Sequence, residues 1–375
     1  MAKNFWNRLQ QRVTLTGVLL VCQVLTARPS SAAEAIMVRY GLFTQSVSIA
    51  DLHQYAETGT ASIALQNFLR YLKREEQTAL RSALQTEIPV KLVALDRVLN
   101  APTGQQFLAQ IARADDRQDQ AGVQALRAAL ILGTKRGERL SILSALEAYP
   151  NPRLTINLPK ALQVLAASMP HPPDDQLSKI PAWQTLVEYQ EIVSQGQQYQ
   201  GCLFGDSISS GLGNSLGEHR FNFAIGGMST VSLVEQLQRL VARQVRCQTV
   251  VIAIGTNDAW YHIDKEPFKQ NMTQILTLVR SLSAKHVYVL PAFYSTVAAS
   301  QKPELAGSLQ RVEEINTWLR DVADEQHVPL EVTALKPLFE QKVLKESFTT
   351  DGVHLNATGR EIYRNALLQL LAAQS

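Results

Sequence analysis

Two segments far apart in the chain hold the side chains of a hydrolytic triad. Residues 205–207 are Gly-Asp-Ser, and residues 351–354, about 150 positions later, are Asp-Gly-Val-His. A serine hydroxyl is a poor nucleophile at neutral pH and needs a base within hydrogen-bond reach. A carboxylate that accepts the Nδ1–H of an imidazole leaves Nε2 free to act as that base. We therefore predict Ser207 as the nucleophile, His354 as the base and Asp351 as the residue that orients the imidazole.

Two further segments could supply hydrogen-bond donors for the charge that develops on the substrate oxygen. Residues 255–258, Gly-Thr-Asn-Asp, follow a very apolar segment, and the Asn257 amide is a neutral donor whose direction the backbone fixes. Gly227 ends an Ala-Ile-Gly-Gly segment, where a glycine N–H can approach a ligand closely because no Cβ blocks it. With the backbone N–H of Ser207, these groups predict a three-donor oxyanion hole. Each segment alone is better explained as a turn or a helix cap, so the prediction depends on their combination and order.

Residues next to these segments are candidates for substrate contact. Trp260 and Tyr261 follow the third predicted strand, Phe293 and Tyr294 follow the fourth, and Met228 follows the predicted oxyanion-hole glycine. The aromatic rings could line an apolar acyl pocket, and the alternative is that some of them pack beneath the loops. An apolar cleft would favour lipid or lysophospholipid esters, whereas a shallow polar cleft would favour acetylated sugars.

The elements that must position these residues alternate between short apolar runs and amphipathic helices. This alternation predicts an α/β fold with a parallel sheet that helices cover on both faces. The five predicted strands are residues 201–204, 221–225, 249–254, 287–290 and 330–332. In such sheets, binding sites collect at the C-terminal ends of the strands, which is where the four segments lie.

In this order and spacing, the four segments resemble the four sequence blocks of the SGNH (GDSL-type) hydrolases. The resemblance covers about residues 201–373, roughly half of the chain. It implies a flavodoxin-like three-layer α/β/α fold and hydrolysis of esters or thioesters without a metal or another cofactor. Carried over residue by residue, it implies the triad Ser207, Asp351 and His354 and an oxyanion hole of Ser207, Gly227 and Asn257. Two departures bear on the substrate: residues 207–209 are Ser-Ile-Ser instead of Ser-Leu-Thr, and Met228 stands where an acidic residue is common.

The N-terminal half has a different pattern. Apolar residues at helical spacing, such as Leu65, Phe68, Leu69 and Leu72, predict a small all-α accessory domain over residues 34–168. Its first segments resemble a helical domain found ahead of secreted hydrolases in cyanobacteria, a resemblance that implies no known chemistry. We interpret it as a packing domain, with a lid or partner-binding module as the alternative. Residues 169–198 predict a linker and a connecting helix, and residues 199–375 the hydrolase domain.

Residues 1–33 have the pattern of a secretory signal peptide. Lys3, Arg8 and Arg12 precede an apolar stretch over residues 13–27, and small residues follow it. We therefore expect an exported protein, in the periplasm, a lumen or the extracellular space, with an uncleaved membrane anchor as the alternative. Residues 1–33 hold four of the 36 basic residues and none of the 33 acidic ones, so the remainder carries a net charge of −1. This near-neutral charge gives no support for a nucleic-acid partner.

Of the three cysteines, Cys22 lies in the predicted signal peptide. Cys202 and Cys247 accompany apolar strand-like runs, which favours buried thiols without a metal or redox role. The alternative is a disulfide between them, as an oxidising compartment would permit.

The sequence thus predicts a secreted serine esterase that acts on a small-molecule, lipid or glycan ester through an acyl-enzyme on Ser207. It leaves open association with a membrane surface or the cell envelope, and the oligomeric state. Two alternatives to this function remain open. One is an O-acetyltransferase or O-acetylesterase of an envelope polysaccharide, and the other is a non-catalytic envelope scaffold.

Overall fold

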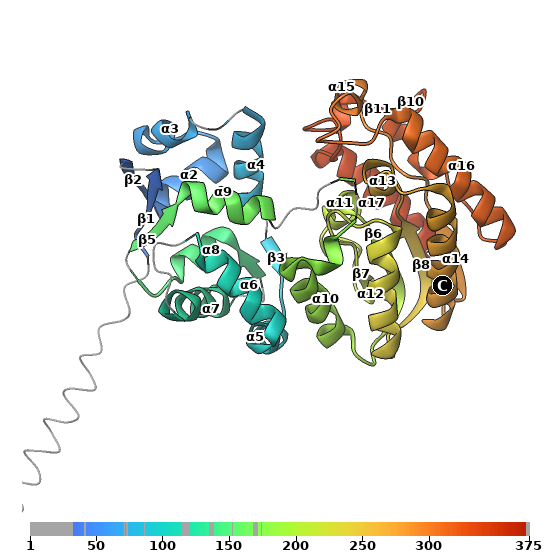
Figure 1. Ribbon diagram of the computed structural model, residues 1–375, viewed down its shortest axis with the longest axis horizontal. Coiled ribbons are helices and arrows are strands. Elements are labelled where there is room, and N and C mark those ends of the chain that lie inside the picture. Colours follow the sequence, from blue (N-terminus) through green and yellow to red (C-terminus); the bar gives the residue numbers. More distant parts are fainter. Residues whose placement is uncertain are drawn as a thin grey trace, which may run out of the picture.

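The computed structural model describes residues 33–372 except 41–42, 71, 73, 86, 115–119, 135–138, 152, 168–171 and 174. All of the predicted signal peptide except Ala33 therefore lies outside the described residues. Figure 1 shows an N-terminal half, coloured blue to green, beside a C-terminal half that is built around a parallel sheet.

A four-stranded parallel sheet forms the centre of the C-terminal half, in the order β7-β6-β8-β9. Its strands are β6 (Gln198–Gly205), β7 (Arg220–Asn222), β8 (Arg246–Ala253) and β9 (His286–Val289). The first strand in sequence is internal, with the second on one side and the third on the other, as in the flavodoxin-like order 2-1-3-4-5. The strand order therefore reverses between β6 and β8, which makes their C-terminal ends the expected position of a site.

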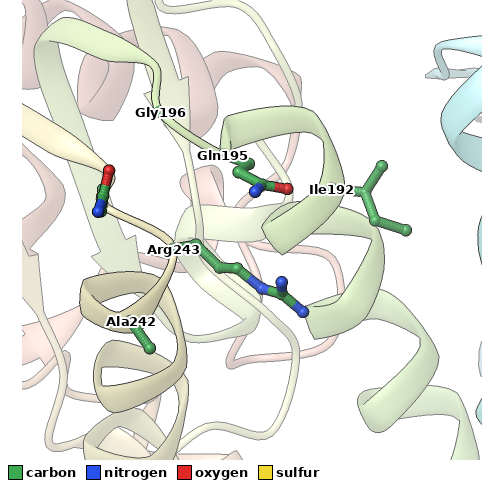
Figure 2. Close-up of a pocket in the computed structure, with 6 residues that line it drawn as sticks. Ile192, Gln195, Gly196, Ala242 and Arg243 are labelled. Carbon is green, nitrogen blue, oxygen red and sulfur yellow. The ribbon is translucent and has the colours of Figure 1, made fainter.

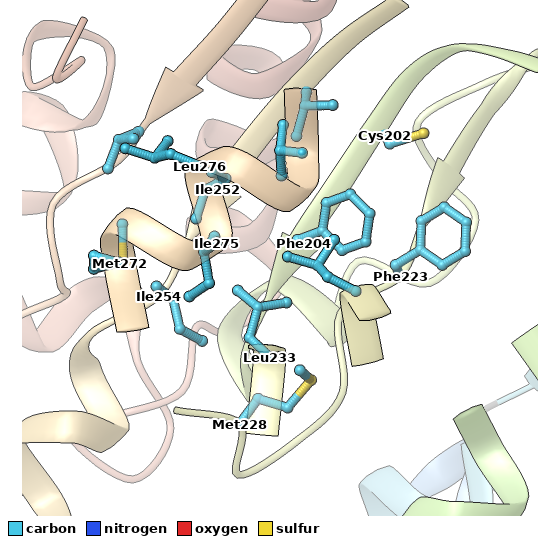
Figure 3. Close-up of a cluster of buried hydrophobic side chains, with 14 of the residues drawn as sticks. Cys202, Phe204, Phe223, Met228, Leu233, Ile252, Ile254, Met272, Ile275 and Leu276 are labelled. Carbon is cyan, nitrogen blue, oxygen red and sulfur yellow. The ribbon is translucent and has the colours of Figure 1, made fainter. Parts of the chain in front are cut away.

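Helices cover both faces of this sheet. Phe204 and Ile252 lie on one face and Leu203 on the other, because successive side chains of a strand alternate. Figure 3 shows Phe204 and Ile252 among side chains of the covering helices, such as Leu233 and Ile275. The helices on this face are α10 (Pro181–Ser194), α12 (Thr230–Ala242), α14 (Lys265–Ser281) and α16 (Leu309–Glu325). The opposite face is covered by α17 (Ala357–Ala372), the short α11 (Ser207–Ser210) and the 3-10 helix η2 (Thr333–Leu338). The result is a three-layer α/β/α arrangement.

The expected fifth strand over residues 330–332 is absent from the described sheet and is reduced to one bridge. Leu330 forms a parallel bridge with Val289 alone. The Val289 N–H donates to the Pro329 carbonyl, and the Val289 carbonyl accepts the Glu331 N–H. Proline has no N–H to donate to a ladder, and Val332 already has helical backbone angles ahead of η2. These two neighbours keep the segment from extending as a strand.

The expectation of an all-α domain in the N-terminal half is wrong. Three strands form a mixed sheet in the order β2-β1-β5, in which β1 pairs antiparallel with β2 and parallel with β5. The strands are β1 (Ala35–Tyr40), β2 (Phe43–Ser48) and β5 (Arg153–Asn157), and a separate pair consists of β3 (Glu87–Pro89) and β4 (Arg139–Ser141). Ile36 and Val38, two positions apart in β1, pack into the adjacent helical core.

Helices still make up most of this half. They are α2 (Ile49–Thr58), α3 (Ile63–Leu69), α4 (Arg74–Gln85), α5 (Leu92–Asn100), α6 (Pro102–Ala112), α7 (Gln120–Thr134), α8 (Ile142–Glu147) and α9 (Leu158–Ala167). Leu65 and Leu69 lie one turn apart and are buried on the same face of α3, as their spacing predicts. Within the described part of the chain, no helix has the length and apolar character needed to span a bilayer.

Helix α10 packs against both halves. Its Trp183 and Val187 are buried in the core of the parallel sheet. From another side of the helix, Tyr189 Oη accepts the backbone N–H of Lys91 at 2.9 Å, and Glu188 accepts a hydrogen bond from Thr103. The helix therefore fixes the connection between the two halves.

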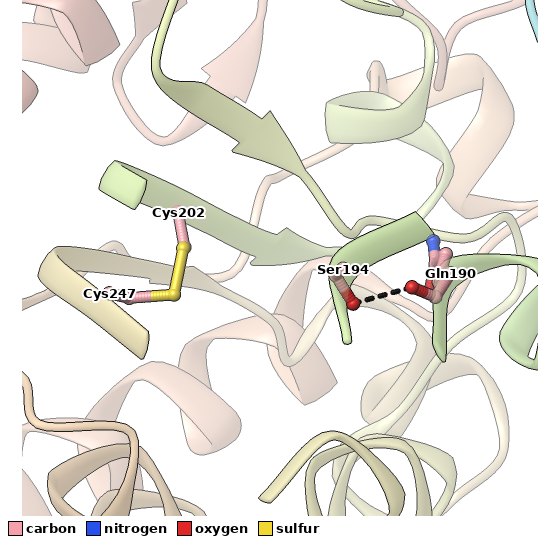
Figure 4. Close-up of a disulfide and its surroundings, with 4 residues drawn as sticks. All are labelled: Gln190, Ser194, Cys202 and Cys247. Atoms are coloured by element: carbon pink, nitrogen blue, oxygen red, sulfur yellow. Dashed lines mark hydrogen bonds between the residues drawn. A yellow bond between two sulfur atoms is a disulfide. The ribbon is translucent and has the colours of Figure 1, made fainter. Parts of the chain in front are cut away.

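Cys202 of β6 and Cys247 of β8 form a disulfide (Figure 4), with Cα atoms 5.9 Å apart. The interpretation of the two cysteines as free buried thiols is therefore wrong, although both are buried. The bridge joins the two central strands, whose C-terminal ends carry the candidate site.

Candidate active site

Ser207 begins α11, immediately after β6 ends. Asp206 caps this helix, because its Oδ1 accepts the backbone N–H of Ile208 at 3.0 Å. A Cβ at Gly205 would lie 2.5 Å from Ser209 Oγ and 2.9 Å from the Ala253 carbonyl oxygen, so only glycine fits there. The tight turn leaves Ser207 partly exposed at the sheet edge.

Asp351 and His354 share a turn ahead of α17. Asp351 Oδ1 accepts the backbone N–H groups of Val353 at 2.9 Å and of His354 at 2.7 Å, and its Oδ2 lies 2.7 Å from His354 Nδ1. The same carboxylate therefore holds both the backbone and the ring of His354. Gly352, at φ 88°, gives the turn its left-handed residue, and its carbonyl accepts the N–H of Thr296.

The fold brings Ser207 to this turn. His354 Nε2 lies 2.9 Å from Ser207 Oγ, which completes a continuous chain of contacts from Asp351 through His354 to Ser207. The side chains of His354 and Asp351 are 48% and 42% exposed, so a solvent-borne substrate can reach them.

The charges around His354 favour its protonated form. Desolvation alone would lower the pKa of His354, but the Asp351 hydrogen bond and the charges of Asp351 and Asp206 outweigh it and raise this pKa above the ordinary value for histidine. Desolvation alone would instead raise the pKa of Asp351, but the hydrogen bonds and charge of His354 lower the pKa of Asp351 to about 2. Burial raises the pKa of the neighbouring Asp206 to about 6. The pair therefore stabilises an imidazolium, as a general base at this position requires.

The loop that carries Gly227 follows β7, and Asn257 follows β8, the two strands that flank β6. The Ile225 N–H donates to the Gly205 carbonyl at 3.1 Å, and a Cβ added to Gly226 would be 3.8 Å from the Ser207 Cβ, so the loop after β7 passes next to Ser207. Gly227 has φ 80°, a left-handed conformation that favours glycine. Asn257, at the start of α13 (Thr256–Trp260), donates one amide hydrogen to the Met228 carbonyl at 2.9 Å, which fixes the plane of the amide.

A small cavity of about 20 Å³, with room for about one water molecule, is lined by Ile208 and Val353, the chain neighbours of Ser207 and His354. Its lining includes Asn257, Trp260, Phe293, Tyr294 and Val353. Trp260 is held in place by its Nε1–H, which donates to the Pro303 carbonyl at 2.8 Å. Three of the predicted aromatic residues therefore line this cavity.

Two predicted substrate residues, Met228 and Tyr261, do not line this cavity. They are 0% and 1% exposed, and Met228 packs in the core beneath the sheet end. Tyr261 Oη donates to the Gly227 carbonyl at 2.8 Å, so this ring supports the loop from below. The prediction of direct substrate contact is wrong for both, because they point inward from loops whose neighbouring residues face the site.

A second and larger hollow, of about 580 Å³, lies at the opposite ends of the strands. Figure 2 shows its lining, which consists of Ile192, Gln195, Gly196, Ala242, Arg243 and Gln244. Gly196 precedes β6 and Gln244 precedes β8, so this hollow is separated from Ser207 by the length of the sheet.

Several supporting residues were not predicted. Thr256 Oγ1 accepts the Phe293 N–H at 2.9 Å, and Asp258 accepts hydrogen bonds from Thr230. Both flank Asn257 in the segment 255–258, so their position in the sequence could have indicated a supporting role. Asp175, which contacts the loop after β7 from the connector, had no such signal. In the described ranges, no three His, Cys, Asp or Glu residues are grouped so as to hold a metal ion.

Two family models match the chain. The model of the GDSL-like lipase/acylhydrolase family matches residues 203–362, and the model described as alpha/beta hydrolase of unknown function (DUF1400) matches residues 32–157. No curated protein sequence matches this chain significantly.

Solved structures of three lipases, acylhydrolases or esterases are similar to about half of this chain. A GDSL-like lipase from Bacteroides thetaiotaomicron is 18% identical, with a TM-score of 0.41, over 47% of this chain and 88% of its own. A lipase/acylhydrolase from Enterococcus faecalis is 19% identical, with a TM-score of 0.38, over 48% and 97%. The acetylxylan esterase Axe2 from Geobacillus stearothermophilus is 17% identical, with a TM-score of 0.36, over 47% and 96%.

The family match spans Gly205, Ser207, Asn257 and His354, the residues that the fold gathers at the ends of β6 and β8. Residues 203–362 therefore form a domain of the GDSL-like lipase/acylhydrolase family, and by that domain the chain is a serine ester hydrolase.

Proposed function

We propose that the chain hydrolyses short-chain carboxylic esters through an acyl-enzyme on Ser207. The observation that carries the proposal is the unbroken contact from the Asp351 carboxylate through His354 to the Ser207 hydroxyl. This arrangement supplies a nucleophile, a base and a group that orients the base.

In the first step, Ser207 Oγ attacks the ester carbonyl carbon while His354 Nε2 takes the hydroxyl proton. The bond to the alcohol oxygen then breaks, and His354 returns the proton to the leaving alcohol. In the second step, a water molecule attacks the acyl-enzyme with His354 again as base, which releases the acid and restores Ser207. Asp351 stabilises the imidazolium in both steps, consistent with the raised pKa of His354.

The oxyanion of each tetrahedral intermediate would be held by three donors. These are the backbone N–H groups of Ser207 and Gly227 and the second amide hydrogen of Asn257, whose first hydrogen is occupied by the Met228 carbonyl. Because that hydrogen bond fixes the amide before substrate arrives, the donor needs no reorganisation during reaction.

The cavity beside Asn257 supports a short acyl group. About 20 Å³ bounded by Trp260, Phe293 and Tyr294 suits the methyl of an acetyl ester, whereas a fatty acyl chain would require these rings to move. The His354 and Asp351 side chains are exposed to solvent, which leaves room for a larger alcohol such as a sugar. Among the substrates left open by the sequence, acetyl esters are therefore preferred over lipid esters.

We also propose that the protein is exported. The signal-like pattern of residues 1–33 supports export, and so does the disulfide between Cys202 and Cys247, because disulfides persist mainly in oxidising compartments. Export would bring the enzyme to acetylated glycans or lipids of the cell envelope.

The direct test compares turnover of p-nitrophenyl acetate by wild type and Ser207→Ala. The variant should lose at least about 10⁴-fold in kcat while its circular dichroism spectrum is unchanged. Ser215→Ala is the matched control, because the buried Ser215 hydroxyl has no hydrogen-bond partner among the described residues. Near-wild-type turnover by Ser207→Ala would exclude the proposed mechanism.

A further inference from the structure

The loop that carries Gly227 is fastened at its far end by two buried carboxylates. Asp258 accepts the Thr230 N–H with both oxygens at 3.1 Å and the Thr230 hydroxyl at 2.5 Å. Asp175 Oδ2 accepts the hydroxyls of Ser229 at 2.5 Å and Ser232 at 2.8 Å. Both carboxylates thus hold the first turn of α12, directly after the predicted oxyanion-hole residues.

Asp175 differs from Asp258 in where it comes from. It lies in the connector between the N-terminal half and the parallel sheet, before the 3-10 helix η1 (Leu177–Lys179). Its Oδ1 accepts the Leu177 N–H at 2.8 Å, and its Oδ2 also accepts the Ser232 N–H at 3.3 Å. A buried carboxylate is costly unless several donors satisfy it, and here four donors do so. Asp175, Ser229 and Ser232 are all buried, so this contact belongs to the packed interior of the protein.

The hydrogen bond from Ser229 to Asp175 also fixes how the serine caps α12. The Ser229 hydroxyl gives its proton to Asp175 and accepts the Val231 N–H at 3.1 Å with a lone pair. Ser229 directly follows Met228, whose carbonyl accepts the Asn257 amide, and is two residues from Gly227. A change in the position of Ser229 is therefore transmitted along two peptide units to the donors beside Ser207.

We propose that Asp175 is a positioning residue for catalysis, through which the interdomain connector holds the Gly227 loop and Asn257 in the geometry of an oxyanion hole. This inference rests on the proposed acyl-transfer function. Replacing Asp175 with Asn would turn one acceptor oxygen into an NH₂ group that faces the donors of Ser229 and Ser232. The loop would then shift, and donors that act on the transition state would be displaced while the acyl cavity stays in place.

Asp175→Asn is best compared with Glu191→Gln. Glu191 is also a buried carboxylate that holds α12, but it accepts Arg239 Nε at 2.8 Å and Nη2 at 3.2 Å, near the end of the helix remote from Ser207. Each substitution removes one negative charge. The two carboxylates that are replaced hold the same helix, α12, at opposite ends. The measurements are kcat and KM for p-nitrophenyl acetate, the rate at which a fluorophosphonate labels Ser207, and the thermal midpoint of unfolding.

Asp175→Asn should lower kcat and the labelling rate by about 10- to 100-fold with KM changed less than about 3-fold. Glu191→Gln should keep kcat within about 2-fold of wild type, even if its thermal midpoint falls by as much as that of Asp175→Asn. Equal losses of kcat in the two variants, or wild-type kcat in Asp175→Asn, would overturn the inference. If Asp175→Asn does not fold, Ser229→Ala removes the same hydroxyl contact and is judged by the same outcomes.

Ser207→Ala in the same assay separates the two proposals. Activity in that variant would refute the acyl-transfer function itself. An inactive Ser207→Ala beside a fully active Asp175→Asn would refute only the positioning role of Asp175.

Discussion

His354 Nε2 lies 2.9 Å from Ser207 Oγ although 147 positions separate the two residues in the chain. Asp351, three positions before His354, holds the other ring nitrogen within the same turn. The triad therefore requires one long-range contact, between the end of β6 and the turn before α17. β6 ends next to this turn, and α17, which follows the turn, packs on one face of the sheet.

Replacing Asp351 with Asn should lower kcat for p-nitrophenyl acetate by about 10⁴-fold at pH 7, because an amide can hold the wrong imidazole tautomer. The pH profile should change as well. In wild type, kcat/KM should rise with pH through a pKa above the ordinary value for histidine, since only neutral His354 accepts the serine proton. Without the Asp351 charge the imidazolium is less stable, so the acidic limb of the residual activity should move to lower pH. An unmoved limb would show that His354 is not the titrating base.

Replacing Asn257 with Ala should lower kcat by about 10²- to 10³-fold with little change in KM, because the lost donor acts on the oxyanion. Asn257→Asp keeps the shape but presents acceptor oxygens, so it should be at least as inactive. Steady-state kinetics of both variants provide the measurement. A rise in KM with wild-type kcat would instead assign Asn257 to substrate binding.

Replacing Trp260 with Ala should enlarge the acyl cavity and shift preference toward longer chains. The ratio of kcat/KM for p-nitrophenyl hexanoate to that for the acetate should rise about 10-fold or more, since each accommodated methylene contributes about 1–3 kcal/mol. Tyr294→Phe is the control, because it keeps the ring in the cavity wall and removes only the hydroxyl that bonds Glu313. Equal ratios in wild type and Trp260→Ala would place the acyl group elsewhere.

Removing the disulfide should lower the free energy of unfolding. A bridge between residues 45 positions apart restricts the unfolded chain enough to contribute about 4 kcal/mol. Urea unfolding of Cys202→Ala/Cys247→Ala should show that loss, whereas kcat of the folded variant should be retained. Wild type unfolded in reductant serves as the control, and a difference below about 0.5 kcal/mol would contradict the estimate.

The residues that meet at the site could be named from the sequence because residue type and local spacing specify their chemistry. Asp351 and His354 pair within one turn, and Ser207 and Asn257 each follow an apolar strand. What the sequence could not specify is the direction of neighbouring side chains. Trp260 borders the cavity while the adjacent Tyr261 is buried under Gly227, since a short helix turns consecutive residues to different sides.

The pairing of strands that lie far apart in the chain could not be predicted from the sequence either. β1 finds its parallel partner β5 over 100 positions later, and five or six residues of each strand show too little alternation to outweigh the helical pattern around them. The four strands of the parallel sheet were predictable because an apolar run lies in or beside each strand and a helix follows it, although β7 itself is Arg-Phe-Asn. The fifth was not excluded in advance, although Pro329 before it was a signal against a full ladder.

The most direct test of the central claim is to locate the nucleophile chemically. A fluorophosphonate should attach once per chain, peptide mapping by mass spectrometry should place it on Ser207, and His354→Ala should slow the labelling by at least about 10³-fold. Attachment at another residue, or labelling of Ser207 at the wild-type rate without His354, would contradict the account.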